Sequence, residues 1–192
     1  MKYFSYILVI GGIIGFAAAF LLTIDKIELL KNASYQPPCN ISPIISCGSV
    51  MKTPQASVFG FPNSLLGIFG FGVVMTVGMA LLAGATLKRW FWLGLEAGTI
   101  FGVVFIHWLF FQSVFVIGAL CPYCMVVWSV TIPIFLYTTL YNLKSGNIHT
   151  PKSIKQFVSV IQKYNRSVLI LWYAAIIVTI LIRFWYYWKT LV

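Results

Sequence analysis

The stretch CPYCMVVWSVTIPIFLYTTLY, residues 121–141, decides the fold that the sequence predicts. It carries no Asp, Glu, Lys or Arg. A helix of about 20 apolar residues is long enough to cross the hydrocarbon core of a bilayer. Pro122 suits the first turn of a helix, because the N–H that proline lacks would have no partner there. We therefore predict a membrane-spanning helix that opens on the pair Cys121 and Cys124.

The rest of the chain has the composition of a membrane protein. Of its 192 residues, 60% are hydrophobic and 8% are charged, which is too few charges to cover a soluble domain of this size. We predict a single membrane domain over residues 1–192 with five spans, at roughly 4–24, 64–87, 91–114, 121–141 and 168–188. Ala17, Ala18 and Ala19 raise the alternative of a cleaved signal peptide. The apolar run continues past them, which favours an uncleaved helix.

The basic residues predict the orientation. The net charge is +10, and positive residues gather on the cytoplasmic side of membrane proteins. With a cytoplasmic N-terminus, the inner segments hold eight of them: Lys2, Lys88, Arg89, Lys144, Lys152, Lys155, Lys163 and Arg166. The outer segments hold five: Lys26, Lys31, Lys52, Arg183 and Lys189. We therefore expect an extracytoplasmic loop at 25–63, a basic cytoplasmic loop at 142–167 and an extracytoplasmic C-terminus, with no role for nucleic acid.

All four cysteines then lie outside the cytosol, where disulfides form and persist. Cys39 and Cys47 fall in the loop at 25–63, and Cys121 and Cys124 at the outer end of the fourth span. The N-terminus of a helix stabilises a thiolate, so the CxxC pair suits redox chemistry. Inert buried cysteines are one alternative. A metal site is another, although the spacing of Cys39 and Cys47 is wider than a zinc site usually has.

The loop pair lies in YQPPCNISPIISCGSV, residues 35–50, which has three prolines and no helical period. A mobile segment of this kind could carry thiols between an external partner and an internal acceptor. The alternative is a static disulfide that closes a small loop. After Cys47, a short apolar segment is expected to lie at the interface as a helix or lid. Asn63, just before the second span, could cap that helix or donate to a ligand carbonyl.

Four motifs occur in order between these spans. They are C-x7-C (Cys39, Cys47), V-x-x-T (Val50, Thr53), FGFPNSLLG (residues 59–67) and CPYC-x3-W (residues 121–128). Together they resemble the vitamin K epoxide reductase family, in its bacterial and archaeal quinone-linked branch, over roughly residues 4–141.

The resemblance implies an all-α fold, a four-helix transmembrane bundle around a quinone site, under a lid helix and beside a fifth transmembrane helix. It implies that Cys39 meets a partner protein, Cys47 passes electrons to Cys121, and Cys124 reduces the quinone. It also assigns quinone contacts: Asn63 to one carbonyl, with Thr53, Phe59 and Trp128 nearby. Trp128 stands where animal members carry a tyrosine, and Thr53 where they commonly carry a serine.

The expected function is that of a quinone-dependent thiol oxidoreductase in the inner (plasma) membrane, which supports disulfide formation. Since no thioredoxin-like domain follows the fifth span, we expect a separate thioredoxin-fold partner of the DsbA type. The expected cofactor is ubiquinone or menaquinone.

Two other readings stay open. A DsbB-type enzyme shares the chemistry but places CxxC after its first span. A non-enzymatic metal-handling protein would use the four cysteines and His107. For His107 itself, a neutral imidazole bonded to a neighbouring helix is the plainer expectation. Glu96 is expected to extend toward Lys88 or Arg89 at the inner surface.

Overall fold

The computed structural model describes residues 3–32, 34–148 and 152–189, which are mostly helical and contain no strand. In this part of the chain, five helices are long and apolar enough to cross a membrane. They are α1 (Phe4–Lys31), α3 (Ser64–Leu82), α4 (Arg89–Phe111) with its π-helical continuation η2 (Gln112–Ile117), α5 (Pro122–Lys144) and α7 (Asn165–Arg183). The predicted all-α integral membrane fold is therefore confirmed.

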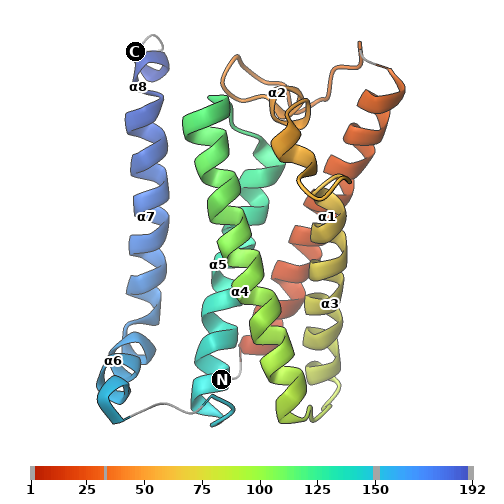
Figure 1. Cartoon of the computed structure of the whole chain (residues 1–192). Coiled ribbons are helices and arrows are strands. Elements are labelled where there is room, and N and C mark those ends of the chain that lie inside the picture. The colour runs from red at the N-terminus through yellow and green to blue at the C-terminus, as the bar shows by residue number, and fades with distance from the viewer. Residues whose placement is uncertain (1–2, 33, 149–151, 190–192) are drawn as a thin grey trace.

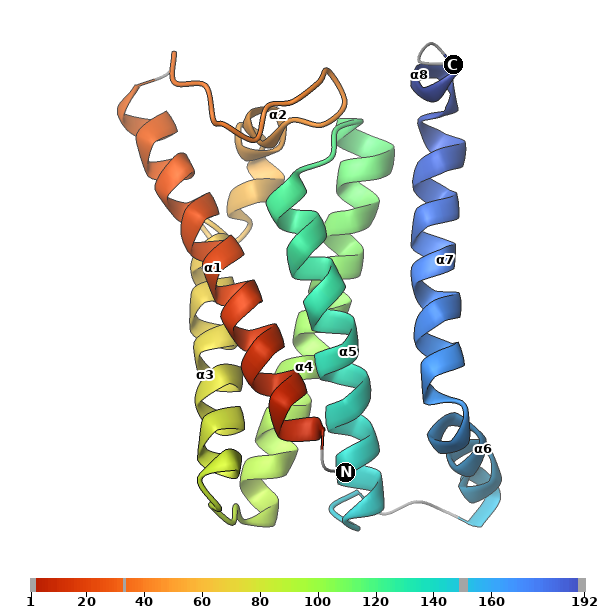
Figure 2. The same ribbon diagram turned by 180° about the vertical axis from the view of Figure 1, so that it is seen from behind.

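Four of these helices form a bundle, and the fifth stands beside it. Helices α1, α3, α4 and α5 run side by side, while α7 lies next to α4 and α5, away from α1 and α3 (Figures 1 and 2). Helix α1 begins at one end of the bundle. The loop that holds Cys39 and Cys47 and the C-terminal helix α8 (Trp185–Trp188) lie at the opposite end.

Glycines let α1 and α3 approach closely. A Cβ added at Gly12 would lie 2.8 Å from the backbone of Met75, and one at Gly78 would lie 2.8 Å from the backbone of Val9. Helices pack in this way in lipid, where small residues allow backbone contact. Gly15 and Gly67 also lie close to side chains of the neighbouring helix, whereas Gly70 has no neighbour within 4 Å of its added Cβ.

Helix α1 continues to Lys31, past the expected end at residue 24. The helix extends through two charged residues, because each of them forms a hydrogen bond with the loop above the bundle. Asp25 accepts a hydrogen bond from Tyr35, and the Lys26 ammonium donates to the carbonyl of Met51 at 2.5 Å. The loop expected at 25–63 thus begins only after α1 has ended.

Glycines in the left-handed conformation follow the ends of α3 and η2. Gly84 has a φ of 88°, and α3 stops at Leu82 instead of reaching residue 87. Gly118 has a φ of 71° and ends η2, which carries the third span beyond the expected residue 114. Such glycines are a common way to close a helix, because the missing Cβ removes the steric cost.

The segment between α5 and α7 contains helix α6 (Lys152–Lys163), where the sequence predicted only a basic loop. Helix α7 ends at Arg183, short of the expected residue 188. Phe184 is fully buried where α7 ends, and the aromatic residues that follow form the separate turn α8.

Helix α7 is attached to the bundle through His107. The His107 ring accepts a hydrogen bond at Nε2 from the Trp172 indole at 2.8 Å, and its Nδ1 lies 2.7 Å from the Val103 carbonyl. An imidazole that accepts at Nε2 and donates at Nδ1 is neutral. His107 therefore binds a neighbouring helix, as the plainer expectation had it.

Glu96 does not extend to the inner surface, so that expectation is wrong. Its side chain is buried and accepts hydrogen bonds from Thr139 at 2.7 Å and Asn142 at 2.9 Å, both on α5. Burial of a carboxyl group is tolerated when hydrogen bonds satisfy it. Glu96 thus joins α4 to α5 inside the bundle.

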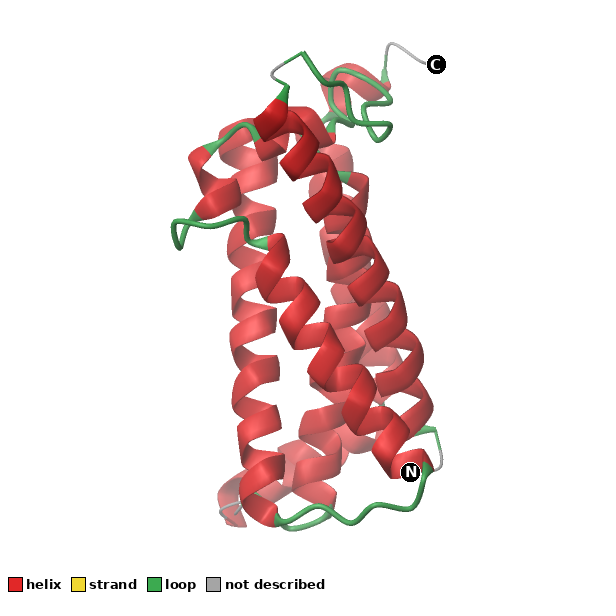
Figure 3. Ribbon diagram, turned by 90° about the vertical axis from the view of Figure 1, so that its right-hand side faces the viewer, coloured by secondary structure: helices red, strands yellow, loops and turns green. Residues whose placement is uncertain are grey.

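Two short helices close the end of the bundle that holds the cysteines. They are α2 (Cys47–Met51), which lies above the start of α3 (Figure 1), and the 3-10 helix η1 (Pro54–Ser57), which follows it. Figure 3 shows the same bundle from the side, with helices joined by loops. The segment before α2 pairs with the turn before α5 through a parallel bridge between Ile45 and Leu120. The Ser46 amide donates to Leu120 at 2.8 Å, and the Leu120 amide donates to Ile44 at 2.7 Å. This bridge brings the two cysteine motifs together.

Candidate redox site

The parallel bridge leads directly into two cysteines. Cys47 follows Ile45 by two residues, Cys121 follows Leu120, and their Sγ atoms lie 3.4 Å apart. Both side chains are fully buried. Sulfur exchange requires this kind of approach, because one sulfur must attack the other.

The four cysteines form one disulfide and one dithiol. Cys39 and Cys47 are bonded, and Cys121 and Cys124 are free. The structure thus holds the loop pair oxidised and the CxxC pair reduced. All four expected redox cysteines lie in one group at one end of the bundle.

Cys121 caps helix α5, as Pro122 at the first helical position predicted. Its Sγ accepts a hydrogen bond from the Cys124 amide at 3.5 Å. A hydrogen bond from the Cys124 thiol, helped by the backbone amides of Cys124 and Tyr123, lowers the pKa of the Cys121 thiol, although burial opposes this. The thiolate form of Cys121 is therefore stabilised at the start of α5.

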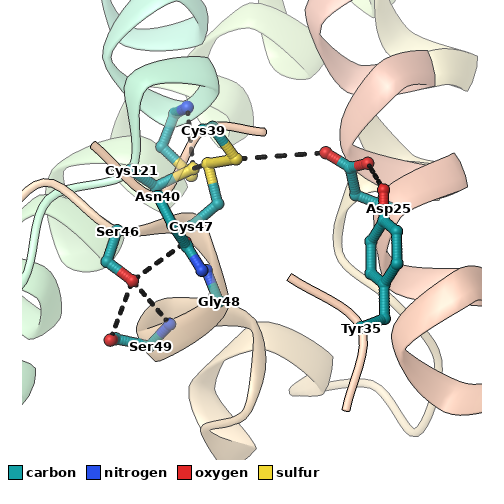
Figure 4. The surroundings of a disulfide bond; sticks show 10 residues. Asp25, Tyr35, Cys39, Asn40, Ser46, Cys47, Gly48, Ser49 and Cys121 are labelled. Atoms are coloured by element: carbon teal, nitrogen blue, oxygen red, sulfur yellow. Dashed lines mark hydrogen bonds between the residues drawn. A yellow bond between two sulfur atoms is a disulfide. The ribbon is translucent and has the colours of Figure 1, made fainter. Parts of the chain in front are cut away.

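The loop around the disulfide is ordered by short hydrogen bonds (Figure 4). The Asn40 side-chain oxygen accepts from the Gly48 amide at 2.9 Å and from the Ser46 hydroxyl at 3.0 Å. The Ser46 hydroxyl in turn accepts from the Ser49 amide and caps α2. These contacts hold the segment that was expected to be mobile.

Asp25 lies on the other side of the disulfide from Cys121 (Figure 4). Its Oδ2 is 3.9 Å from the Cys39 sulfur, and its Oδ1 accepts from the Tyr35 hydroxyl at 2.9 Å. That hydrogen bond is the main reason why the pKa of Tyr35 is raised. The sequence analysis missed both residues. The signal was present, since Asp25 is one of only three acidic residues and adjoins an apolar run.

A cavity of about 490 Å³ extends into the bundle below the cysteines. Cys121 and Cys124 line it, as do residues from α1, α3, α4, α5 and the α2–η1 segment. Its wall is mostly apolar. The polar side chains on it are Lys26, Gln55, Asn63, Ser64, Thr99, Gln112, Ser113 and Thr131. Apolar cavities with few polar groups are typical of sites for small hydrophobic ligands.

Asn63 lines this cavity but makes no side-chain cap to α3. Its amide nitrogen donates to the Gln55 carbonyl at 2.7 Å, and its oxygen accepts from the Val58 amide at 3.1 Å. Asn63 therefore fixes η1 over the cavity. The amide nitrogen carries two N–H groups, and a second hydrogen bond from it is not seen within the described residues, so the expected contact with a quinone carbonyl stays a prediction.

Trp128 lines the cavity and is buried against Phe110, with its ring edge-on at 5.2 Å. Its indole N–H can donate a hydrogen bond but cannot accept one. Phe59 is half-exposed and contacts Phe105, which lines the cavity. Thr53 donates to the Val50 carbonyl at 2.7 Å and does not reach the cavity wall. The roles expected for these three residues stay predictions.

The metal-handling alternative gains no support from this geometry. Within the part of the chain that the structure describes, no three His, Cys, Asp or Glu side chains gather where they could hold a metal ion. His107 is bonded to Val103 and Trp172, and Cys39 and Cys47 are bonded to each other.

A membrane-spanning helical bundle whose two cysteine pairs meet above an apolar cavity is built for thiol–disulfide exchange at a membrane. The family model described as "Vitamin K epoxide reductase family" matches residues 6–139, which is more than half of the chain, so the protein belongs to that family. It is an integral membrane thiol oxidoreductase that works through cysteine pairs. Comparison with curated proteins gave no match.

Proposed function

We propose that this protein oxidises a reduced thioredoxin-fold protein outside the cytosol and passes the electrons to a quinone in the cavity. The observation that carries the proposal is the 3.4 Å contact between Cys47 and Cys121 at the mouth of that cavity. It joins a disulfide at the outer end of the bundle to a dithiol on the cavity wall. The function in the cell would be to regenerate a DsbA-type oxidase.

The first exchange takes place at the loop pair. A thiolate of the partner attacks Cys39, a mixed disulfide forms, and Cys47 leaves as a thiolate. The second thiol of the partner loses its proton and attacks the partner's own bonded sulfur, which releases Cys39. The partner is now oxidised, and Cys39 and Cys47 hold two electrons.

The second exchange takes place across the 3.4 Å contact. The Cys47 thiolate attacks Cys121 in a Cys121–Cys124 disulfide, and Cys124 leaves. Cys39 then attacks Cys47, and Cys121 leaves. A low pKa makes a thiol a better leaving group, so the lowered pKa of Cys121 favours this step. The product has the loop pair oxidised and the CxxC pair reduced, which is the arrangement in the structure.

The cavity fits a quinone, because it combines an apolar wall with a few hydrogen-bond donors. Asn63 and Trp128 line it, and each carries an N–H group that would donate to a quinone carbonyl. A bound ubiquinone or menaquinone would take up two electrons and two protons and leave as the quinol. Cys121 and Cys124 would supply the electrons and close their disulfide again. Val50, Met51 and Gln55 cover the outer end of the cavity and would limit the access of water.

We further propose that the N-terminus is cytoplasmic and that the cysteine end of the bundle faces outward in the inner (plasma) membrane. The distribution of Lys and Arg supports this orientation. It also puts the disulfide in an oxidising compartment.

The test uses the purified full chain in lipid discs, a reduced DsbA-type protein and a short-tailed quinone. Quinone absorbance is followed while partner thiols are counted. We expect one quinone to be consumed for each dithiol oxidised, and no consumption by the Cys121→Ala variant. Oxidation of the partner without loss of quinone would contradict the proposed acceptor. No oxidation of the partner would contradict the proposed donor.

A further inference from the structure

The two sulfurs of the loop disulfide have different surroundings. The Cys39 sulfur lies 3.9 Å from the Oδ2 of Asp25, while the Cys47 sulfur lies 3.4 Å from the Cys121 sulfur. A disulfide sulfur has no proton to donate, so in this state Asp25 contributes a charge beside Cys39 and accepts no hydrogen bond from it. The difference matters when the disulfide opens, because one sulfur must then take a negative charge.

The Asp25 carboxyl group is held in place beside the disulfide. The Tyr35 hydroxyl donates to its Oδ1 at 2.9 Å. Asp25 is 6% exposed, so solvent screens it little. The two lysines nearest to Asp25 in the sequence bind other groups. Lys26 donates to Met51, and Lys31 pairs with Glu28 at 2.8 Å, which is the ion pair found within the described residues.

We propose that Asp25 decides which sulfur leaves when a thiolate opens the Cys39–Cys47 disulfide. A nearby carboxylate disfavours a second negative charge, so a thiolate on Cys39 is the less stable product. The more stable thiolate leaves faster. The incoming sulfur therefore bonds to Cys39, the Cys39–Cys47 bond breaks, and the electron pair leaves on Cys47. No oxidant takes part in this step.

The consequence is a direction for the exchange. The released charge appears on the sulfur that already touches Cys121, and the external thiol stays on the sulfur beside Asp25. The inference rests on the proposed route of electrons from the loop pair to the CxxC pair. Asp25 acts on a reacting atom, so it is a further residue of the reaction.

The test isolates the loop pair. In a Cys121→Ala/Cys124→Ala background, without quinone or partner, the oxidised protein meets a limiting amount of 2-mercaptoethanol. The reaction is stopped with acid, free thiols are alkylated, and mass mapping locates the adduct. We expect the adduct on Cys39. In the Asp25→Asn variant, which keeps an oxygen for Tyr35, we expect the ratio of Cys47 to Cys39 adducts to rise about tenfold.

The matched control is Glu28→Gln, which removes an exposed carboxylate from the same helix and should leave the ratio unchanged. Burial alone also favours attack at Cys39, because Cys47 is fully buried. If burial decides, Asp25→Asn leaves the adduct where it was, and the proposal is overturned. An equal change in Glu28→Gln overturns it as well.

A second measurement reads the charge on Cys39 directly. In a Cys47→Ala variant, alkylation of Cys39 is followed against pH. The titratable groups that face the site are Tyr35, Glu28, Lys26, Tyr123 and Cys121, and they are the same with and without Asp25→Asn. We expect half-maximal alkylation at a lower pH in Asp25→Asn. An unchanged pH overturns the proposal. Neither measurement involves quinone or partner, so a failure here is distinct from a failure of the proposed function.

Discussion

Cys47 and Cys121 lie with their sulfurs 3.4 Å apart although 74 positions separate them in the chain. Neither cysteine is bonded to the other, since Cys47 is paired with Cys39 and Cys121 is free. The contact is the point at which the extramembrane loop and the membrane bundle meet chemically. Its consequences for each cysteine differ and can be tested separately.

Removing Cys124 should trap the exchange at this contact. In a Cys124→Ala variant, the sulfur that would regenerate the CxxC disulfide is missing. After mild oxidation, Cys121 is therefore expected to form a bridge to Cys47, which mass mapping of a non-reduced digest detects. The matched Cys121→Ala variant should form no such bridge to Cys124. If Cys121 stays free in Cys124→Ala and Cys39 remains bonded to Cys47, the proposed order of exchange is wrong.

Removing Cys39 should affect turnover with the protein partner more than turnover with a small reductant. In Cys39→Ala, we expect turnover driven by the protein partner to be lost, because the sulfur proposed to form the mixed disulfide is gone. Turnover driven by a small dithiol should be partly kept, since such a molecule can reach the CxxC pair itself. Quinone absorbance measures both rates. Substantial turnover with the protein partner would refute the role given to Cys39.

The thiolate of Cys121 should depend on the Cys124 side chain. The hydrogen bond from the Cys124 thiol is the largest cause of the lowered pKa of Cys121, so its loss should raise that pKa toward the ordinary thiol value. Thiolate absorbance at Cys121 should then appear at higher pH in Cys124→Ala. Cys124→Ser keeps a donor and should appear at a pH between those of Cys124→Ala and the wild type. Equal curves for the serine and alanine variants would exclude the hydrogen bond as the cause.

The proposed orientation predicts which residues a membrane-impermeant thiol reagent can label. In intact reduced cells, the cysteines at the outer end of the bundle should react. The control is Ser145→Cys in a background without the four native cysteines, because Ser145 is exposed beyond the inner end of α5. It should react only after the membrane is made permeable. The opposite pattern would reverse the orientation and contradict a partner outside the cytosol.

Stability should depend on which glycine is changed. Gly12→Ala places a methyl group 2.8 Å from the backbone of Met75, and overpacking of this kind typically costs about 1–3 kcal/mol. Gly94→Ala meets no atom within 4 Å, and alanine favours a helix by about 1 kcal/mol over glycine. Unfolding in detergent should therefore occur earlier in Gly12→Ala and no earlier in Gly94→Ala. Equal midpoints would show that α1 and α3 do not pack as closely as described.

Much of the architecture followed from the sequence because it depends on local patterns. Apolar runs predicted the five helices, and Pro122 predicted that Cys121 caps α5. What failed depends on contacts between distant residues. Helix α1 continues past residue 24 because Asp25 and Lys26 find partners in the loop, and no local pattern announces those partners.

The sequence predicted that the four cysteines lie at the same end of the bundle, but it did not predict the contacts of the residues around them. The side chain of Asn63 does not cap α3 but binds Gln55 and Val58, in a segment with no clear period, and its contact with a ligand stays a prediction. Glu96 was placed by its distance from the inner surface, while Thr139 and Asn142 on another helix determine where it lies. A single sequence gives the spacing of residues along one helix, but it does not show which residues of another helix lie opposite them.

The bridge between Ile45 and Leu120 fixes the backbone next to the two cysteines that exchange disulfides, Cys47 and Cys121. Its main-chain hydrogen bonds hold the backbones of the two cysteine motifs in register, so a change of disulfide partner needs rotation about side-chain bonds and no travel of the loop. The rate of electron transfer between the two cysteine pairs would then be limited by the chemistry of disulfide exchange and not by movement of the loop. Lengthening the loop between Lys31 and Cys39 should in that case leave the transfer between the pairs almost as fast as before.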